Sequence, residues 1–127
     1  MTGKSHEEWL RQADYDLDTA EFMHREGRHL YAVFMCHLSV EKAIKGLFQR
    51  RVSGAPPKTH NLMQILNATG ARPPERIERL LIRLNEASVS TRYPDDIEAA
   101  LAAYSREAVD AVLIGAKEAI QWIKQQF

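Results

Sequence analysis

The sequence predicts an all-α fold, an antiparallel up-and-down bundle of about five helices in one domain over residues 1–127. Residues 30–48 are apolar on nearly every side in their first half, which is typical of a helix at the centre of a fold. Other segments repeat apolar residues every three or four positions, as amphipathic helices do. Stretches rich in proline, glycine and serine separate these segments, and no stretch shows the strict alternation that predicts a strand.

The first helix is predicted to begin near residue 6 and to end at Gly27. Ser5 and Glu8 have the spacing of a capping box, and Gly27 suits a left-handed C-cap. The apolar stripe of this helix consists of Trp9, Ala13, Leu17, Ala20 and Met23. Only a few residues separate it from the central helix, which runs to near Arg51. We therefore expect the two helices to form an antiparallel hairpin.

A loop and two further helices follow the central helix. Two consecutive prolines within residues 53–57 cannot continue a helix. Thr59 is the predicted N-cap of a short helix that ends at Gly70. The next helix is predicted to begin at Pro73-Pro74, and residues 88–94 are predicted to form a second break.

The last helix is predicted to run from about Ile97 to near the C-terminus, capped by Asp95 with Glu98 as its return partner. Gly115 in the middle of this helix suggests a close helix crossing, since glycine is otherwise unfavourable there. Four alanines widen its apolar surface beyond what one neighbour would cover: Ala102, Ala103, Ala111 and Ala116. We therefore expect a subunit interface, and a homodimer as the commonest symmetric assembly.

The composition restricts the classes of partner and the location that can be expected for this protein. The formal net charge is zero, so the composition does not indicate a general attraction to nucleic acid or to a membrane surface. Residues 42–74 nevertheless hold six basic residues and no acidic one. The single cysteine, Cys36, lies in the most apolar run and is interpreted as a core residue. No signal peptide or membrane-spanning run is visible, and we expect a cytoplasmic protein.

No metal site and no cofactor are predicted. The sequence has no glycine-rich phosphate loop, no cysteine pair and no His-x-x-x-His pair. His24 and His29 are five positions apart across the first predicted turn, which does not place them on one helical face. Asp14, Asp16 and Asp18 alternate within a periodic helix, and we interpret them as a solvated face rather than a calcium loop.

One polar line crosses the central helix, formed by His37, Glu41 and Lys45 at intervals of four. A histidine beside a carboxylate can act as a general base that the acid orients. The alternative, which we favour for His37, is a buried polar line that satisfies its own hydrogen bonds. Lys42 and Lys45 lie nearer the end of this helix, and either could face a ligand.

The run PPKTHNL places Lys58 and His60 at the start of a predicted helix. A helix N-terminus offers free backbone donors and the positive end of a dipole, which suit a phosphate. The alternative is that Thr59 and His60 only cap the helix.

The run TRYPDD combines Arg92 and Tyr93 with two carboxylates. An arginine and a tyrosine can hold a phosphate and a nucleobase. The alternative is an ion pair from Arg92 to Asp95 or Asp96 that fixes the turn.

Together, the runs HLSVEKAIKGLF, PPKTHNL, TRYPDD and YSREAVDAV resemble the HEPN family of small all-α domains over nearly the whole chain. The resemblance implies an antiparallel helical bundle that is usually a homodimer. It also implies a frequent pairing with a minimal nucleotidyltransferase, as a toxin–antitoxin or nucleotide-handling pair.

Many HEPN proteins are metal-independent endoribonucleases, whose signature is an arginine, four to six residues, then a histidine. Here three residues separate Arg25 from His29, eight separate Arg51 from His60, and no histidine follows Arg92. The sequence therefore resembles the branch that lacks this motif, and no catalytic residue is predicted.

These observations predict a non-catalytic HEPN module that binds a nucleotide, RNA or a nucleotidyltransferase partner through a basic cleft at one pole of the bundle. The residues expected to line this cleft are Lys42, Lys45, Lys58, His60, Arg92, Tyr93 and Asp95. Asp95 is expected to orient Arg92. The alternative function is a metal-independent endoribonuclease that uses His60 as acid or base, with Arg92 or Lys58 stabilising the transition state.

Overall fold

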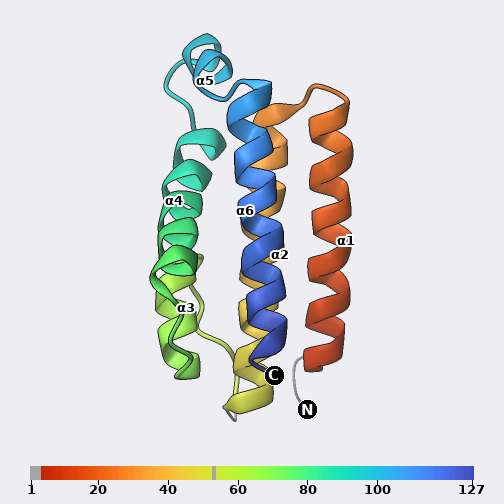
Figure 1. The fold of residues 1–127 in the computed structure, drawn as a ribbon, viewed down its shortest axis with the longest axis vertical. Coiled ribbons are helices and arrows are strands. Elements are labelled where there is room, and N and C mark those ends of the chain that lie inside the picture. Colours follow the sequence, from red (N-terminus) through yellow and green to blue (C-terminus); the bar gives the residue numbers. More distant parts are fainter. Residues whose placement is uncertain (1–3, 53) are drawn as a thin grey trace.

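The computed structural model describes residues 4–52 and 54–127, and over these residues it consists of six helices without a strand (Figure 1). The helices are α1 (His6–Arg25), α2 (His29–Arg51), α3 (Leu62–Thr69), α4 (Glu75–Arg92), α5 (Ile97–Ala103) and α6 (Arg106–Gln125). The all-α bundle is confirmed. None of these helices combines the length and apolar character that crossing a membrane requires.

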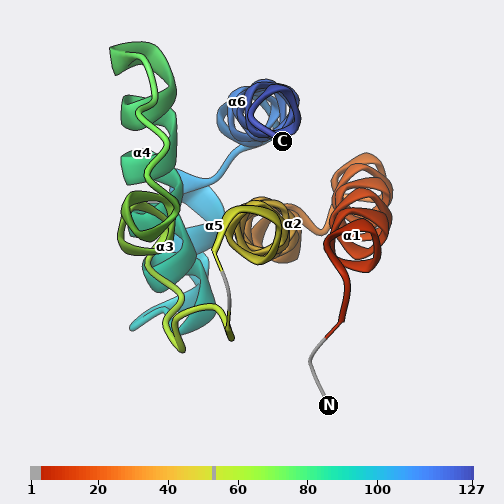
Figure 2. The same ribbon diagram turned by 90° about the horizontal axis from the view of Figure 1, so that it is seen from below.

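The α2 helix is the centre of the bundle, as predicted. It contacts each of the other five helices, and the end view places it between α1 and the pair formed by α3 and α4, with α6 alongside (Figure 2). Ile44 and Leu47 of α2 are fully buried against Leu62, Leu81 and Ile123 from three other helices. Because neighbours surround α2, it presents buried residues in nearly every direction.

The α1 helix begins and ends where the sequence predicts, but only the Ser5 half of the predicted capping box forms within the described residues. The Ser5 hydroxyl accepts a hydrogen bond from the backbone N–H of Glu8 at 3.1 Å. The Glu8 carboxylate accepts hydrogen bonds from Arg11 and Gln12. Gly27 follows α1 with φ +88°, a left-handed conformation that glycine adopts without steric cost.

The cap of α3 differs from the prediction. Asn61, not Thr59, is the N-cap, since its side-chain oxygen accepts the backbone N–H of Gln64 at 3.1 Å. The Thr59 hydroxyl accepts the backbone N–H of Asn61 at 3.2 Å instead. Gly70 ends α3 with φ +82°, as predicted.

The break predicted at residues 88–94 is present but begins later, because α4 continues to Arg92 and residues 93–96 separate it from α5. Hydroxyl side chains in its last turns bond to carbonyls of the preceding turn, Ser90 to Glu86 at 3.1 Å and Thr91 to Ala87 at 2.8 Å. Such bonds let serine and threonine remain inside a helix. The helix ends where Pro94 restricts the residue before it.

The predicted last helix is interrupted, which is why the bundle has a sixth helix. Asp96 rather than Asp95 caps α5, and Ser105 caps α6 by accepting the N–H of Ala108 at 3.3 Å. The close crossing predicted at Gly115 is present, since a Cβ there would lie 2.9 Å from Leu80 of α4.

Cys36 is fully buried, and burial raises the pKa of its thiol to about 12. The thiol is therefore protonated near neutral pH, which agrees with its interpretation as a core residue.

Candidate functional site

The buried carboxylate of Glu41 holds the segment before α3 against α2. Glu41 is 3% exposed. One of its oxygens accepts a hydrogen bond from Lys45 Nζ at 2.8 Å, and His60 Nδ1 lies 3.0 and 3.2 Å from the two oxygens. An unpaired buried carboxylate would be costly, and these partners offset that cost.

His37 continues this arrangement one turn earlier on α2. Its Nε2 lies 3.3 Å from the side-chain oxygen of Asn85, which also accepts the backbone N–H of Leu62 at 3.1 Å. The Asn85 oxygen can only accept, so His37 Nε2 carries the hydrogen. His37 Nδ1 lies 3.8 Å from Glu41 and has no hydrogen-bond partner.

The side chains of His37, Glu41, His60 and Asn85 therefore form one polar seam that joins α2, α4 and the start of α3. Burial lowers the pKa of His37, and the positive charge of Arg92 lowers it further, although Glu41 and the Asn85 hydrogen bond act in the opposite direction. His37 is therefore neutral near neutral pH. The polar line expected on α2 is present, and it is completed by residues far away in the sequence.

A cavity of about 330 Å³ lies beside the polar seam, between α2, the start of α3 and the second half of α4. Its lining residues are His37, Thr59, His60, Asn61, Asn85, Ser88, Val89, Arg92 and Tyr93. The volume is in the range of small-molecule sites, and most of the lining side chains can donate or accept hydrogen bonds.

Arg92 and Tyr93 supply the cation and the aromatic ring of this cavity. The Arg92 guanidinium lies 4.6 Å from the centre of the Phe34 ring, and its Nε is buried without a hydrogen-bond partner. Within the described residues Arg92 forms no ion pair with Asp95 or Asp96, which removes the alternative in which such a pair fixes the turn. Tyr93 is 79% exposed.

Three of the seven predicted site residues line this cavity together, namely His60, Arg92 and Tyr93. The other four do not line it. Lys45 forms an ion pair with Glu41, and Lys58 and Asp95 are exposed.

Lys42 faces α1, where its Nζ lies 2.8 Å from Asp16. Asp16 is 6% exposed, so the interpretation of Asp14, Asp16 and Asp18 as one solvated face is wrong for Asp16. The spacing of the three aspartates suggested a solvated face. It did not show that Lys42 of the next helix would pair with Asp16.

The site also does not lie at one pole. The C-terminal end of α2 and the turn before α5 lie at opposite ends of the bundle (Figure 1). The cavity forms on the flank instead, because the chain after α2 turns back along it and places His60 beside Glu41.

The sequence reasoning did not identify Asn61, Asn85 and Ser88 as part of the site. One signal for Asn85 was present. It lies four residues after Leu81 and therefore on the apolar face of this segment, where an asparagine requires polar partners.

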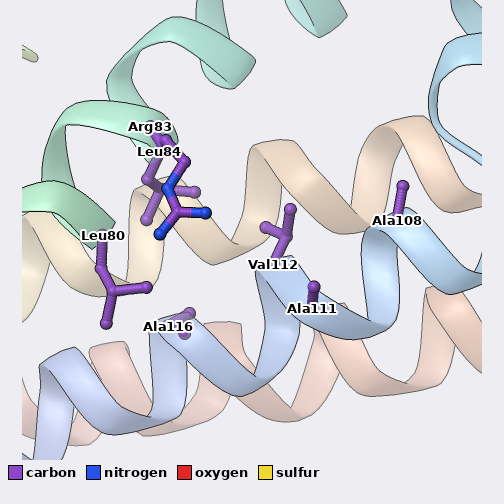
Figure 3. A pocket seen from close by; sticks show the side chains of 8 residues that line it. Leu80, Arg83, Leu84, Ala108, Ala111, Val112 and Ala116 are labelled. Atoms are coloured by element: carbon purple, nitrogen blue, oxygen red, sulfur yellow. The ribbon is translucent and has the colours of Figure 1, made fainter. Parts of the chain in front are cut away.

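A second groove, of about 240 Å³, lies between α4 and α6 and is mainly apolar (Figure 3). Leu80 and Leu84 of α4 face Val112, Ala111 and Ala116 of α6, and Arg83 is its one charged lining residue. This groove therefore lacks the converging polar groups of a small-molecule site.

Comparisons with known proteins agree with the fold. A family model described as the HEPN domain matches residues 6–126. The crystal structure of ST0689, an archaeal HEPN homologue, is 26% identical, with a TM-score of 0.80 over 98% of each chain. The crystal structure of TT1696 from Thermus thermophilus is 24% identical, with a TM-score of 0.81 over 96% of this chain and 98% of that one, and this likeness shows the fold alone. No curated protein matches the sequence.

The lowered pKa of His37 predicts a pH dependence of stability. The folded state favours the neutral form of His37. The contribution of His37 to the free energy of unfolding is therefore fully present above the unfolded pKa of about 6.5 and is lost as pH falls below that value. We expect the free energy of unfolding of the wild type to fall more steeply between about pH 7 and about pH 5 than that of His37→Gln.

Urea denaturation at several pH values measures this difference. Equal slopes for the wild type and His37→Gln would contradict the assignment.

Proposed function

Because this chain belongs to the HEPN domain family, we propose that it is a non-catalytic HEPN module that binds the phosphate and base of a nucleotide in the cavity beside the polar seam. The observation that carries this proposal is the position of Arg92 in the cavity and the absence of polar partners for its side chain among the described residues. Among the residues that the structure describes, the Arg92 guanidinium has no carboxylate partner and its Nε has no hydrogen-bond partner, and Arg92 lines the cavity. A planar guanidinium in this state is suited to a phosphate, which it can bind with two parallel hydrogen bonds.

The neighbours of Arg92 favour a nucleotide over a bare anion. Tyr93 is the next residue and is largely exposed, so its ring can stack on a base. Asn61 and Asn85 place amide groups in the same cavity, and amides can pair with base edges.

His60 completes the polar lining. Its Nδ1 is engaged by Glu41, which leaves Nε2 as the ring nitrogen available to a ligand. Its side chain is 67% exposed. A ligand can therefore reach His60 without displacing the polar seam.

The partner that we propose is a minimal nucleotidyltransferase, with which the chain would form a pair of the toxin–antitoxin type. The support is the family resemblance together with a site suited to nucleotides, since a nucleotidyltransferase handles the same class of molecule.

We also propose that the protein is a homodimer that uses the α4–α6 groove and the adjoining face of α6. Ile114 of α6 is 58% exposed. Ala111 is exposed and lines the groove together with leucine and valine side chains (Figure 3). Exposed apolar surface of this kind often marks a contact between subunits.

Nucleotide binding is tested by titrating the protein with the four nucleoside triphosphates in a calorimeter. For the nucleotide that binds, Arg92→Lys should weaken binding about tenfold, because lysine keeps the charge but loses the planar fork. Tyr93→Ala should cost about 1–3 kcal/mol through lost stacking. Added salt should weaken wild-type binding.

Arg79→Lys is the matched control, since Arg79 lies on the same helix and pairs with Glu75 outside the cavity. It should bind as the wild type does. Wild-type affinity in both Arg92→Lys and Tyr93→Ala, or no binding by the wild type, would contradict the proposed site.

Dimerisation is tested by light scattering at micromolar concentration. We expect a mass of twice 14.5 kDa for the wild type. Ala111→Arg should give a monomer, because it places a charge in the apolar face. A monomeric wild type would contradict the proposed interface.

A second candidate function is metal-independent RNA cleavage, and the contact of His60 with Glu41 is the observation that favours it. A carboxylate at Nδ1 orients a histidine whose other nitrogen can act as acid or base. If this function is correct, RNA is cleaved in the presence of a chelator and the activity is lost in His60→Ala. The non-catalytic proposal predicts no cleavage in either protein.

A further inference from the structure

A second cluster of titratable groups lies away from the polar seam, where α1 ends and α2 begins. His24 Nε2 lies 2.5 Å from an oxygen of Asp110, and His24 Nδ1 lies 2.8 Å from His29 Nδ1. The contacts therefore run from Asp110 of α6 to His24 of α1, and from His24 to His29 of α2. We refer to these three side chains as the relay.

The turn at Gly27 brings the two histidines together, although their spacing does not place them on one helical face. The positive φ of Gly27 reverses the chain within three residues, and the two imidazole rings then meet edge to face with their centres 4.7 Å apart. His24 is 6% exposed, so Asp110 and His29 are the groups that satisfy its ring nitrogens.

The hydrogen-bond directions follow from this order. The Asp110 carboxylate accepts, so His24 Nε2 carries a hydrogen. In the neutral relay His24 Nδ1 therefore accepts the hydrogen of His29 Nδ1, and His29 Nε2 is left as a free acceptor. If His29 Nε2 binds a proton, His29 carries the positive charge and both hydrogen bonds of the relay keep their direction.

His29 also lines a cavity of about 250 Å³ between the α1–α2 turn and the α4–α5 turn. Arg28 and Arg92 line the same cavity, and Tyr31, Ile97 and Leu101 supply an aromatic and apolar wall. No acidic residue is among its lining residues. The cavity therefore combines two cations with a histidine that can become a third.

We propose that this cavity is a second anion site, which takes a tetrahedral oxyanion such as a phosphate group and binds one proton on the relay as the anion enters. The proton comes from solvent and attaches to His29 Nε2, while the Nδ1 hydrogen of His29 stays bonded to His24 and the Nε2 hydrogen of His24 stays bonded to Asp110. The net change is one added positive charge, opposite the anion.

The charges around His29 support this coupling. Burial, His24 and Arg106 lower the pKa of His29, while Asp110 and Glu107 raise it. Arg28 and Arg92 add positive charge from the turn and from α4. The empty site therefore favours neutral His29, and an anion would reverse that preference.

This inference does not depend on nucleotide binding in the first cavity, although Arg92 lines both cavities. The test consequently uses residues that belong to only one of them. Sulfate is the probe, because it stays fully ionised near neutral pH and cannot itself account for proton uptake.

The experiment measures sulfate binding near pH 7 by calorimetry in two buffers with different ionisation enthalpies, together with NMR titration of the histidine ring protons. We expect proton uptake by the wild type and a raised pKa of His29 when sulfate is bound. His29→Gln should abolish the uptake, and Asp110→Asn should reduce it. Asp14→Asn, a matched substitution at an exposed aspartate that pairs with Lys124, should change neither quantity.

Three results would overturn the proposal: no sulfate binding, binding without proton uptake, or uptake that persists in His29→Gln. If His60→Gln abolishes the uptake, the proton belongs to the first cavity and the proposal is likewise wrong. If Tyr93→Ala loses nucleotide binding but keeps the proton uptake that accompanies sulfate binding, the two cavities bind their ligands independently.

Discussion

The candidate site depends on one buried carboxylate. Glu41 lies on the central helix, where nearly every direction is occupied by a neighbouring helix or by the chain that folds over it. A charge in that position is tolerated only with partners, and Lys45 of the same helix supplies one of them. The other is His60, which belongs to the segment that follows α2. The requirement for this second partner explains why the segment turns back along α2 and why the cavity lies on the flank of the bundle.

The same helix thus serves the core and the site. Fully buried Ile44 and Leu47 join the apolar core, while His37 and Glu41 join α2 to Asn85 and His60 through polar contacts. Asn85 in turn accepts the first N–H of α3, so the polar seam also fixes where that helix begins. Arg92 lies one turn beyond Ser88 on α4, and its position follows from the packing of α4 on α2.

The parts of the fold that were predicted correctly depend on local signals. The apolar character of residues 30–48 belongs to one continuous segment, and the capping by Ser5 and the left-handed Gly70 each act within one turn of the chain. The break expected at residues 88–94 was placed to begin too early, because Ser90 and Thr91 can occur in a loop or can bond to helix carbonyls, and the packing of α4 decides between these. Tyr104 and Ser105 carried no comparably strong signal for the break between α5 and α6.

Prediction of the site was limited by contacts between distant residues. His60, Arg92 and Tyr93, which line the cavity, were predicted because their residue types and expected loop positions suit a phosphate and a base. Lys42 could not be excluded from sequence, since its partner Asp16 lies on another helix. The contact between His24 and His29 was missed for a related reason, because a turn rather than helical spacing brings them together.

A double-mutant cycle on the free energy of unfolding tests most directly whether Glu41 holds the segment before α3. Glu41→Gln, His60→Asn and the double variant would be compared with the wild type by urea denaturation. We expect a coupling energy between about 0.5 and 3 kcal/mol, as for residues in direct contact. Effects that add to within about 0.3 kcal/mol would show that the two side chains act independently, and would contradict the role assigned to Glu41.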